Sequence, residues 1–344
     1  MKSRLIKCTL ITVVLLLTGC SSLIADKIEN AKVPILYSGD QVDALIDKLH
    51  IQTQKYCSKT SSFCTEYYYL APTPLKTSEK TKKAGSIELT GTFEDSAKSV
   101  KKSLKLTEVD RNKYKGTVIL LHGYGGSKNI WLFTMDYFKF LGFDVIAIDM
   151  AGHGAATMTP GFGTNDAPLL NQFINSELRN LPEPVLLIGH SMGAVAAVKT
   201  AKLNSSVNAL VLLAPMQAFD EATLGVAKTY SPWLEVFTPD YYIKKAALRV
   251  LSRRKLSVSD TNVMNDLPSL NIPILVYGAS DDPISNIDAF SKLNLPEVQT
   301  RVNNEESHIT PVFVGTKQHE ILQRWLSSLP RVNRADIGGN NEID

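Results

Sequence analysis

Five short apolar runs, none interrupted by a polar residue, constrain the fold of this chain more than any other feature. The runs cover residues 118–121, 145–148, 185–188, 209–213 and 274–277. A strand that is apolar at every position fits between two layers of helices, because both of its faces are then buried. Amphipathic segments separate the runs, and this alternation predicts an α/β fold with a doubly wound, mostly parallel sheet.

The segments between and around these runs predict the remaining elements. Helical spacing of apolar residues occurs over residues 40–56, 129–141, 167–181, 192–203 and 317–329. Candidate strands lie at 66–70 and 104–109, as antiparallel edges, and at 297–302, as a final strand. Residues 72–101 are rich in Lys, Ser and Thr, which predicts a loop or an edge hairpin.

The interval 216–270 is much longer than a single crossover helix requires. It is predicted to form a helical cap above the carboxyl ends of the strands. Large apolar residues are frequent in it: Phe219, Leu224, Tyr230, Trp233, Leu234, Phe237, Tyr241 and Tyr242. Most of them are expected to pack a small core, and some to face a substrate.

The amino terminus has the pattern of an export signal. Lys2, Arg4 and Lys7 precede an apolar run over residues 10–18. A transmembrane anchor is the alternative, but this run is too short to cross roughly 30 Å of hydrocarbon.

The four residues that end this segment, Leu-Thr-Gly-Cys at 17–20, resemble the lipobox of bacterial lipoproteins. The resemblance implies that residues 1–19 are removed and that Cys20 carries acyl chains, which hold the protein at a membrane of the cell envelope. Ser21 follows the cysteine, where an aspartate would suggest the inner membrane, so the outer membrane is the expected address. Residues 20–60 are then a tether and an amino-terminal helix.

Removing the signal also removes the excess positive charge. The chain carries a formal charge of +3, and residues 1–19 hold three basic and no acidic residues, which leaves a mature charge of zero. Such a protein lacks the basic footprint of a nucleic-acid partner. Basic clusters at 80–83 and 253–255 are interpreted as solvated faces, with contact to anionic lipid headgroups as the alternative.

Two cysteines remain after Cys8 and Cys20 are accounted for. Cys57 and Cys64 form an even pair in a chain predicted to be exported, so a disulfide between them is expected. Two buried thiols are the alternative. A metal site is disfavoured, because His50 is the only further ligand type nearby.

The motif Gly189-His-Ser-Met-Gly193 joins an apolar run to a helical segment that begins at Ala194. A serine on a tight turn between a strand and a helix lies in strained backbone and exposes its Oγ, while the glycines allow the two elements to approach. Free N–H groups at the helix start point toward developing negative charge. Ser191 is therefore the candidate nucleophile, and an ordinary glycine-flanked turn is the alternative.

This motif in this context resembles the α/β-hydrolase superfamily, especially its monoacylglycerol-lipase-like and serine-aminopeptidase-like members, over residues ~103–330. The resemblance implies an α/β-hydrolase domain over residues 61–344, with the cap at about 216–270. Those members often carry a further glycine where this chain has Ala194, which predicts a small adjustment in packing.

The resemblance extends to the turn His122-Gly-Tyr-Gly-Gly126, which follows the first parallel run. It implies an oxyanion hole formed by the backbone N–H groups of Tyr124 and Met192. A dinucleotide-binding or phosphate-binding loop is the rival interpretation, but Lys128 stands where the third glycine of the dinucleotide pattern belongs. Asp149 and His153, within Asp149-Met-Ala-Gly-His-Gly154, match a structural turn of the superfamily.

A serine hydroxyl needs a base, and His308 is the candidate among six histidines, since it lies in a loop after a predicted strand. The order Ser, Asp, His along the chain is that of the superfamily. Similar hydrolases place the acid three residues after a glycine, which selects Asp281, with Asp282 as the second choice. Both acids capping a helix that starts at Pro283 is the alternative.

Together these features predict a serine hydrolase that cleaves carboxylic esters through an acyl-enzyme on Ser191, with no metal or cofactor. The apolar cap favours an apolar acyl ester as substrate. A thioesterase, aminopeptidase or acyltransferase of the same fold remains open, as does a non-catalytic lipoprotein that binds a partner at the surface.

Overall fold

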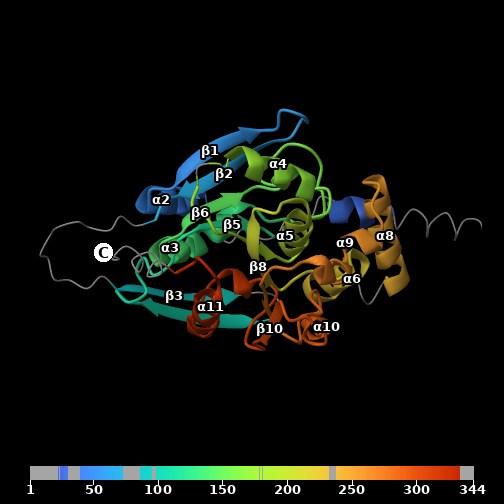
Figure 1. Ribbon diagram of the computed structural model, residues 1–344. Coiled ribbons are helices and arrows are strands. Elements are labelled where there is room, and N and C mark those ends of the chain that lie inside the picture. The colour runs from blue at the N-terminus through green and yellow to red at the C-terminus, as the bar shows by residue number, and fades with distance from the viewer. Residues whose placement is uncertain are drawn as a thin grey trace, which may run out of the picture.

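A computed structural model describes residues 22, 24–29, 39–72, 86–94, 98–177, 179, 181–231 and 238–333. Its main sheet has eight strands in the order β1-β2-β6-β5-β7-β8-β9-β10 (Figure 1). β1 pairs with β2 and β2 with β6 in antiparallel register, and every pairing from β6 to β10 is parallel. The predicted α/β fold with a mostly parallel sheet is confirmed.

The bounds of the elements follow the chain. The strands are β1 Gln52–Cys57, β2 Cys64–Leu70, β3 Ile87–Glu94, β4 Ser99–Leu106, β5 Thr117–Leu121, β6 Asp144–Ile148, β7 Val185–His190, β8 Val207–Leu213, β9 Ile274–Gly278 and β10 Val298–Val302. The α-helices are α2 Gly39–Leu49, α3 Leu132–Leu141, α4 Ala167–Glu177, α5 Met192–Leu203, α6 Phe219–Tyr230, α8 Asp240–Arg253, α9 Val258–Thr261, α10 Ile287–Ser291 and α11 Thr316–Ser328. Short 3₁₀ helices are η1 Lys128–Trp131, η3 Val263–Asn265, η4 Leu267–Ser269 and η5 Thr310–Val312.

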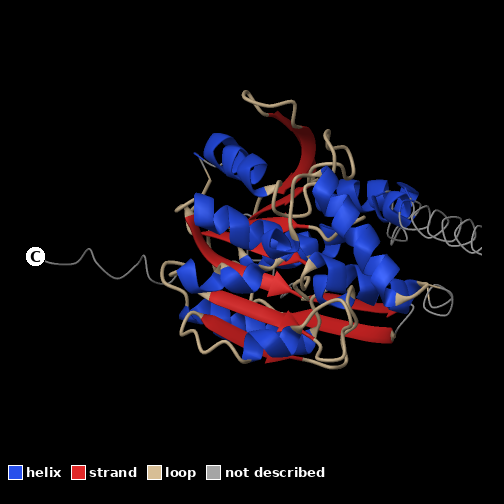
Figure 2. Ribbon diagram, turned by 90° about the vertical axis from the view of Figure 1, so that its right-hand side faces the viewer, coloured by secondary structure: helices blue, strands red, loops and turns tan. Residues whose placement is uncertain are grey.

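The central strands are buried on both faces, which is why their sequences are apolar throughout. In β5, Ile119 and Leu121 belong to a core that includes α4 and α5. Val118 and Leu120 belong to a second core, on the opposite face, that includes α3 and α11. Figure 2, drawn at right angles to Figure 1, shows the helices packed around the strands. The parallel strands therefore end together at one edge of a sheet that is covered on both sides.

The amino-terminal part differs from the prediction of one long helix over residues 40–56. The helix α2 ends at Leu49, because His50 adopts a left-handed conformation (φ 58°) and the next N–H, of Ile51, bonds back to Ile46. The strand β1 follows. The helical spacing of the apolar residues thus ended seven residues earlier than predicted.

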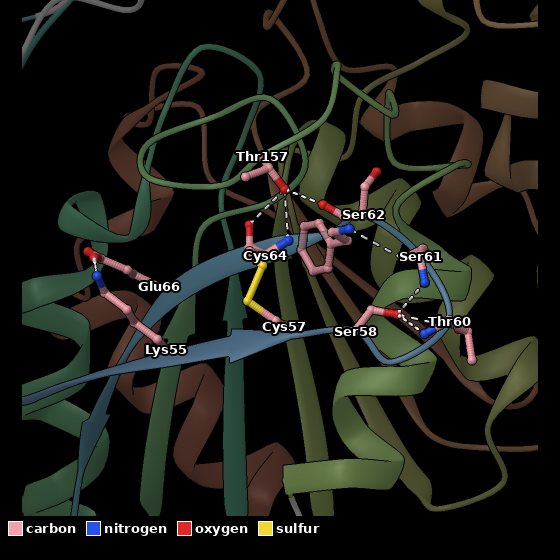
Figure 3. The surroundings of a disulfide bond; sticks show 10 residues. Lys55, Cys57, Ser58, Thr60, Ser61, Ser62, Cys64, Glu66 and Thr157 are labelled. Carbon is pink, nitrogen blue, oxygen red and sulfur yellow. Dashed lines mark hydrogen bonds and ion pairs between the residues drawn. A yellow bond between two sulfur atoms is a disulfide. The ribbon is translucent and has the colours of Figure 1, made fainter.

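The predicted disulfide between Cys57 and Cys64 is present, and it joins directly opposed residues of the hairpin β1–β2 (Figure 3). Thr157, from the loop after β6, accepts the N–H of Cys64 at 2.8 Å. The disulfide therefore closes a hairpin tip that also contacts the loop beside the sheet edge.

The predicted edge strand at 104–109 is only partly correct. Residues 99–106 form β4, which pairs with β3 in a separate two-stranded sheet and not with the main sheet. Every second residue of β4 is buried, so the hairpin β3–β4 lies with one face on the body of the protein. Residues 87–94 and 99–101 thus belong to a hairpin, as one interpretation of residues 72–101 held, but not to an edge of the main sheet; residues 73–85 and 95–97 lie outside the described residues.

The cap predicted at 216–270 contains α6, α8, α9, η3 and η4, inserted between β8 and β9 (Figure 1). Phe219 is buried against Phe162, whereas Tyr241 is exposed. Trp233, Leu234 and Phe237, predicted as part of its aromatic set, lie outside the described residues. Across the described part of the chain, no helix has the length and apolar character needed to span a bilayer.

Candidate active site

The backbone places Ser191 on a sharp bend between β7 and α5. Ser191 has φ 52° and ψ −115°, outside the regions that L-residues ordinarily adopt. A Cβ added at Gly189 would lie 2.2 Å from the carbonyl oxygen of Gly193, and one at Gly193 would lie 2.1 Å from that of Leu121. Only glycine fits at either position, so strand and helix approach as closely as the predicted tight turn requires; we call residues 189–193 the elbow.

His308 lies beside this serine, in the loop after β10. Its Nε2 is 2.9 Å from Ser191 Oγ, and its Nδ1 is 2.7 Å from Asp282 Oδ2. The three side chains come from the carboxyl ends of β7, β9 and β10, and all are largely buried. Serine, imidazole and carboxylate therefore form one continuous chain of hydrogen bonds.

The carboxylate in this chain belongs to Asp282, which corrects the choice of Asp281 made from the sequence. Asp282 Oδ1 accepts the N–H of Ile284 at 2.9 Å and that of Ser285 at 3.4 Å, so its turn aims Oδ2 at His308. Asp281 points outward and bonds to Lys98 Nζ at 2.7 Å. The spacing rule failed because it counts residues from a glycine but does not register how the turn orients each side chain.

The helix-cap alternative for these two acids is also wrong, since the nearest helix, α10, begins at Ile287 and is capped by Asn286. Burial raises the pKa of Asp282, but the imidazole of His308, with the two backbone N–H groups, outweighs burial and lowers that pKa below its ordinary value. Asp282 is consequently ionised where it contacts His308.

The turn predicted to hold the oxyanion packs directly on the elbow. A Cβ at Gly123 would lie 2.8 Å from His190 Nδ1 and 3.3 Å from Ser191 Cβ. Met192 is the first residue of α5, so its N–H has no acceptor within the helix. The N–H groups of Tyr124 and Met192 therefore both belong to segments in contact with the nucleophile.

The other motif residues have structural partners. Asp149 accepts the N–H of Lys128 at 2.7 Å and that of Ala155 at 2.9 Å, and also pairs with the Lys128 ammonium group. His122 Nε2 accepts the N–H of Met150 at 3.0 Å, and burial lowers the pKa of this imidazole to about 4. These contacts hold the turn after β6 against the turn after β5.

His190, inside the elbow motif, connects the segment that carries Ser191 to the loop that carries His308. Its Nε2 donates to the carbonyl oxygen of His308 at 2.8 Å. Burial, and then the neighbouring His308, lower the pKa of His190 to about 3. His190 is therefore a neutral imidazole that ties the base loop to the elbow.

A cavity of about 270 Å³ lies between the cap and the end of the sheet. Its lining is mainly apolar and includes Met216, Val263, Met264 and Phe290. One lining residue, Met216, donates its N–H to the carbonyl of Ser191 at 3.3 Å, and the lining includes none of Ser191, Asp282 and His308. In the described ranges, no group of three or more His, Cys, Asp or Glu side chains is arranged to hold a metal ion.

A set of charged residues behind His308 was not predicted from the sequence: Lys98, Lys102 and Glu306. Lys102 and Glu306 form a buried ion pair of 2.8 Å between β4 and the His308 loop. One sequence signal for it exists. In Ser99–Leu106, alternate residues are Val100, Lys102, Leu104 and Leu106, so a lysine stands at a core-facing position.

Sequence comparison finds relatives that match parts of this chain. Residues 112–263 match the family described as Serine aminopeptidase, S33. Protein phosphatase methylesterase 1 of Mus musculus is 33% identical over 91 residues, 25% of this chain and 24% of that protein. 1-acylglycerol-3-phosphate O-acyltransferase ABHD5 of Sus scrofa is 33% identical over 118 residues, 33% of each. The chain thus spans about a quarter of the length of the methylesterases it matches.

Solved structures with the same fold cover almost the whole chain. The Pyrococcus furiosus esterase Pf2001 superposes with a TM-score of 0.55 at 15% identity, covering 87% of this chain and 98% of the esterase. A membrane phospholipase A described as a bacterial virulence factor gives 0.54 at 15% identity, covering 95% and 98%. With the strand order, these superpositions show that the chain has the α/β-hydrolase fold.

Proposed function

We propose that this protein is a serine hydrolase that cleaves carboxylic esters through an acyl-enzyme on Ser191. The observation that carries the proposal is the hydrogen-bonded series from Ser191 Oγ through His308 to Asp282. A strained serine next to an imidazole, itself oriented by a buried carboxylate, is the arrangement that acyl transfer requires.

In the proposed reaction, Ser191 Oγ attacks the ester carbonyl while His308 Nε2 takes the hydroxyl proton. Asp282 holds the Nδ1–H of the imidazole and stabilises its positive charge. The carbonyl oxygen becomes an oxyanion that accepts hydrogen bonds from the N–H groups of Tyr124 and Met192, each worth on the order of 10²–10³ in rate. His308 then protonates the departing alcohol, and water, deprotonated by the same imidazole, releases the acid from Ser191.

The lining of the cavity supports an apolar acyl group as the part of the substrate that enters it. The backbone N–H of Met216, one residue of this lining, donates to the carbonyl of Ser191. A series of p-nitrophenyl esters of increasing chain length measures this directly, because kcat/KM should rise with chain length until the cavity of about 270 Å³ is filled.

The comparisons do not distinguish ester cleavage from the related reactions, so experiments must separate them. The relatives include a protein named as an acyltransferase and a family named for an aminopeptidase. An acyltransferase transfers the acyl group from Ser191 to an alcohol in preference to water, so product analysis with added glycerol separates the two. Hydrolysis of an amino-acid anilide, but not of an ester, would support an aminopeptidase.

The proposal is tested by labelling with a fluorophosphonate, which reacts with an activated serine. Wild-type protein should label, and Ser191→Ala should not. Folded wild-type protein that does not label would support the alternative of a non-catalytic binding lipoprotein and overturn the proposed function.

We further propose that the mature protein is anchored through acylated Cys20 in the bacterial envelope. The described residues nearest to it support a short tether. Asp26 and Glu29 pair with Arg253 at the end of α8, and the Tyr124 hydroxyl donates to the carbonyl of Ile28 at 2.8 Å. In a bacterial host, Cys20→Ser should abolish incorporation of labelled palmitate, and fractionation of the wild type should place it with the outer membrane.

A further inference from the structure

The hairpin β3–β4 lies outside the main sheet, yet two of its lysines reach the loops that carry the acid and the base. An isolated two-stranded hairpin is only marginally stable, so this one depends on its contacts with the body of the protein. Phe93 of β3 stacks on Phe313 at 3.8 Å between ring centroids, and Thr316 Oγ1 donates to the carbonyl of Ser103. Both contacts join the hairpin to the segment that follows His308.

Lys102 makes the central contact. Its Nζ donates to Glu306 Oε1 at 2.9 Å and to the carbonyl oxygens of Thr310 and Phe313, each at 2.7 Å. An ammonium group has three protons, so these bonds use its whole donor capacity. The acceptors lie on both sides of His308 in the sequence, and one buried cation thereby fixes both ends of the short segment that carries the base.

Glu306 is equally well satisfied. Its Oε1 also accepts the hydroxyl of Tyr277 in β9 at 2.7 Å, and its Oε2 accepts the hydroxyl of Thr310 at 2.6 Å. A buried ion pair is tolerated only when its remaining hydrogen-bonding capacity is met, as it is here. The base loop is therefore connected through Glu306 to β4 on one side and to β9, the strand that precedes Asp282, on the other.

Lys98 connects the two loops at the surface. Its Nζ donates to Asp281 Oδ2 at 2.7 Å and to the carbonyl oxygens of Asn304 and Glu306, at 2.9 and 3.1 Å. Asp281 adjoins the acid, and Asn304 and Glu306 precede the base. Lys98 thus bridges the acid loop and the base loop, with Asp281 as its partner.

We propose that the hairpin β3–β4 is a clamp that aligns Asp282 and His308 with Ser191, in which Lys102, Lys98 and Asp281 are positioning residues. The proposal rests on the proposed serine-hydrolase function. Loss of the clamp leaves the nucleophile and the cavity in place but misdirects the imidazole. It therefore lowers kcat and the rate of fluorophosphonate labelling, while KM stays nearly constant.

The chain supplies its own controls. Lys101 neighbours Lys102 but points to the exposed face of β4, so Lys101→Met makes the same chemical change without touching the loops. Phe173 lies in the core on the other face of the sheet, packed against Tyr56 and Tyr67, and Phe173→Leu provides a variant destabilised far from the hairpin.

The experiment compares kcat, KM and labelling rate for wild type, Lys102→Met, Lys98→Ala and the two controls, at a temperature where circular dichroism shows each to be folded. Lys102→Met should lower kcat on the order of 10²-fold with KM unchanged within about twofold, because small misplacements of a reacting group are that costly. Lys98→Ala should lower kcat about 3- to 10-fold, and adding Asp281→Asn should change nothing further, since both remove one interaction.

The clamp is overturned if folded Lys102→Met keeps the wild-type kcat. It is also overturned if Phe173→Leu, compared at the same melting temperature as Lys102→Met, loses as much kcat. If Lys102→Met does not fold, Lys98→Ala provides the test, because the ion pair between Lys98 and Asp281 is partly exposed and its loss should leave the protein folded. Wild-type kcat in that variant then contradicts the proposal. Wild-type protein that does not label at all overturns the proposed function, and the clamp with it. If wild type labels but the variants keep the wild-type kcat, only the clamp is overturned.

Discussion

On one side of the candidate site, Ser191 is held by backbone. Gly189 and Gly193 let β7 and α5 meet with carbonyl oxygens where a Cβ would otherwise lie, and Gly123 brings the turn predicted to hold the oxyanion against the same serine. On the other side, His308 and Asp282 lie on loops held by charged side chains, above all Lys102 and Lys98. A substitution that disturbs the backbone packing displaces a whole strand and helix, whereas a substitution in the side-chain network removes one hydrogen bond or ion pair at a time.

A substitution in the elbow should therefore cause a large loss of both activity and stability. Gly193→Ala places a Cβ 2.1 Å from the carbonyl oxygen of Leu121, so strand and helix must separate. We expect activity to fall on the order of 10³-fold and the free energy of unfolding to fall by about 4 kcal/mol, at the severe end of single substitutions. Urea unfolding and ester hydrolysis measure both.

The matched control is Gly39→Ala, where an added Cβ meets no atom within 4 Å. It should leave activity unchanged. If Gly193→Ala behaved like this control, backbone packing would not be what holds the nucleophile.

His190 joins the two sides, and it should make the protein sensitive to acid. Its pKa in the folded protein is about 3, below the ordinary histidine value of about 6.5. Between these values the unfolded chain binds a proton that the folded chain excludes, so stability is lost as the pH falls below about 6.5. At pH 4.5 the cost is about 2–3 kcal/mol.

His190→Gln retains an N–H for the carbonyl of His308 and does not titrate. The difference in unfolding free energy between pH 7.5 and pH 4.5 should therefore shrink by about 2–3 kcal/mol in this variant, as measured by urea titration. An unchanged difference would show that His190 is not the group that resists protonation.

The smallest effect should come from removing one bond of the side-chain network. Tyr277→Phe deletes the hydroxyl that donates to Glu306 at 2.7 Å, which should cost about 1 kcal/mol of stability. Since Glu306 adjoins the base, kcat should fall by about 2- to 5-fold as well.

Tyr69→Phe is the control, because its hydroxyl bonds to Asp144 at 2.6 Å, at the opposite end of β6 from the site. It should lose comparable stability with no change in kcat. Equal kcat losses in both variants would mean that the network has no special connection to the base.

The difference between the two sides of the site also explains which of their features could be predicted from the sequence. The elbow and α5 follow from backbone requirements, which demand particular residues at particular spacings and so leave a readable motif. The oxyanion role of the turn at 122–126 was implied by the resemblance alone and stays a prediction. The disulfide and the buried strands follow from composition and pattern alone. Each of these predictions depends on neighbours along the chain.

The base side could not be predicted as well, because its contacts are distant in sequence. Lys102 and Glu306 are 204 residues apart, and only the alternation in β4 hints that Lys102 faces inward. Asp281 and Asp282 are adjacent, and their roles are decided by the turn that aims one at His308 and by Lys98, which binds the other. Spacing from a glycine carries neither piece of information.

The most direct test of this account compares Asp282→Asn with Asp281→Asn in one assay of kcat/KM on a p-nitrophenyl ester. Asp282→Asn should lose on the order of 10³–10⁴-fold, because the imidazole loses the carboxylate that orients and stabilises it. Asp281→Asn should lose less than about tenfold, because it weakens only the Lys98 bridge. The reverse order, with Asp281→Asn the more damaging, would contradict the assignment on which the account depends.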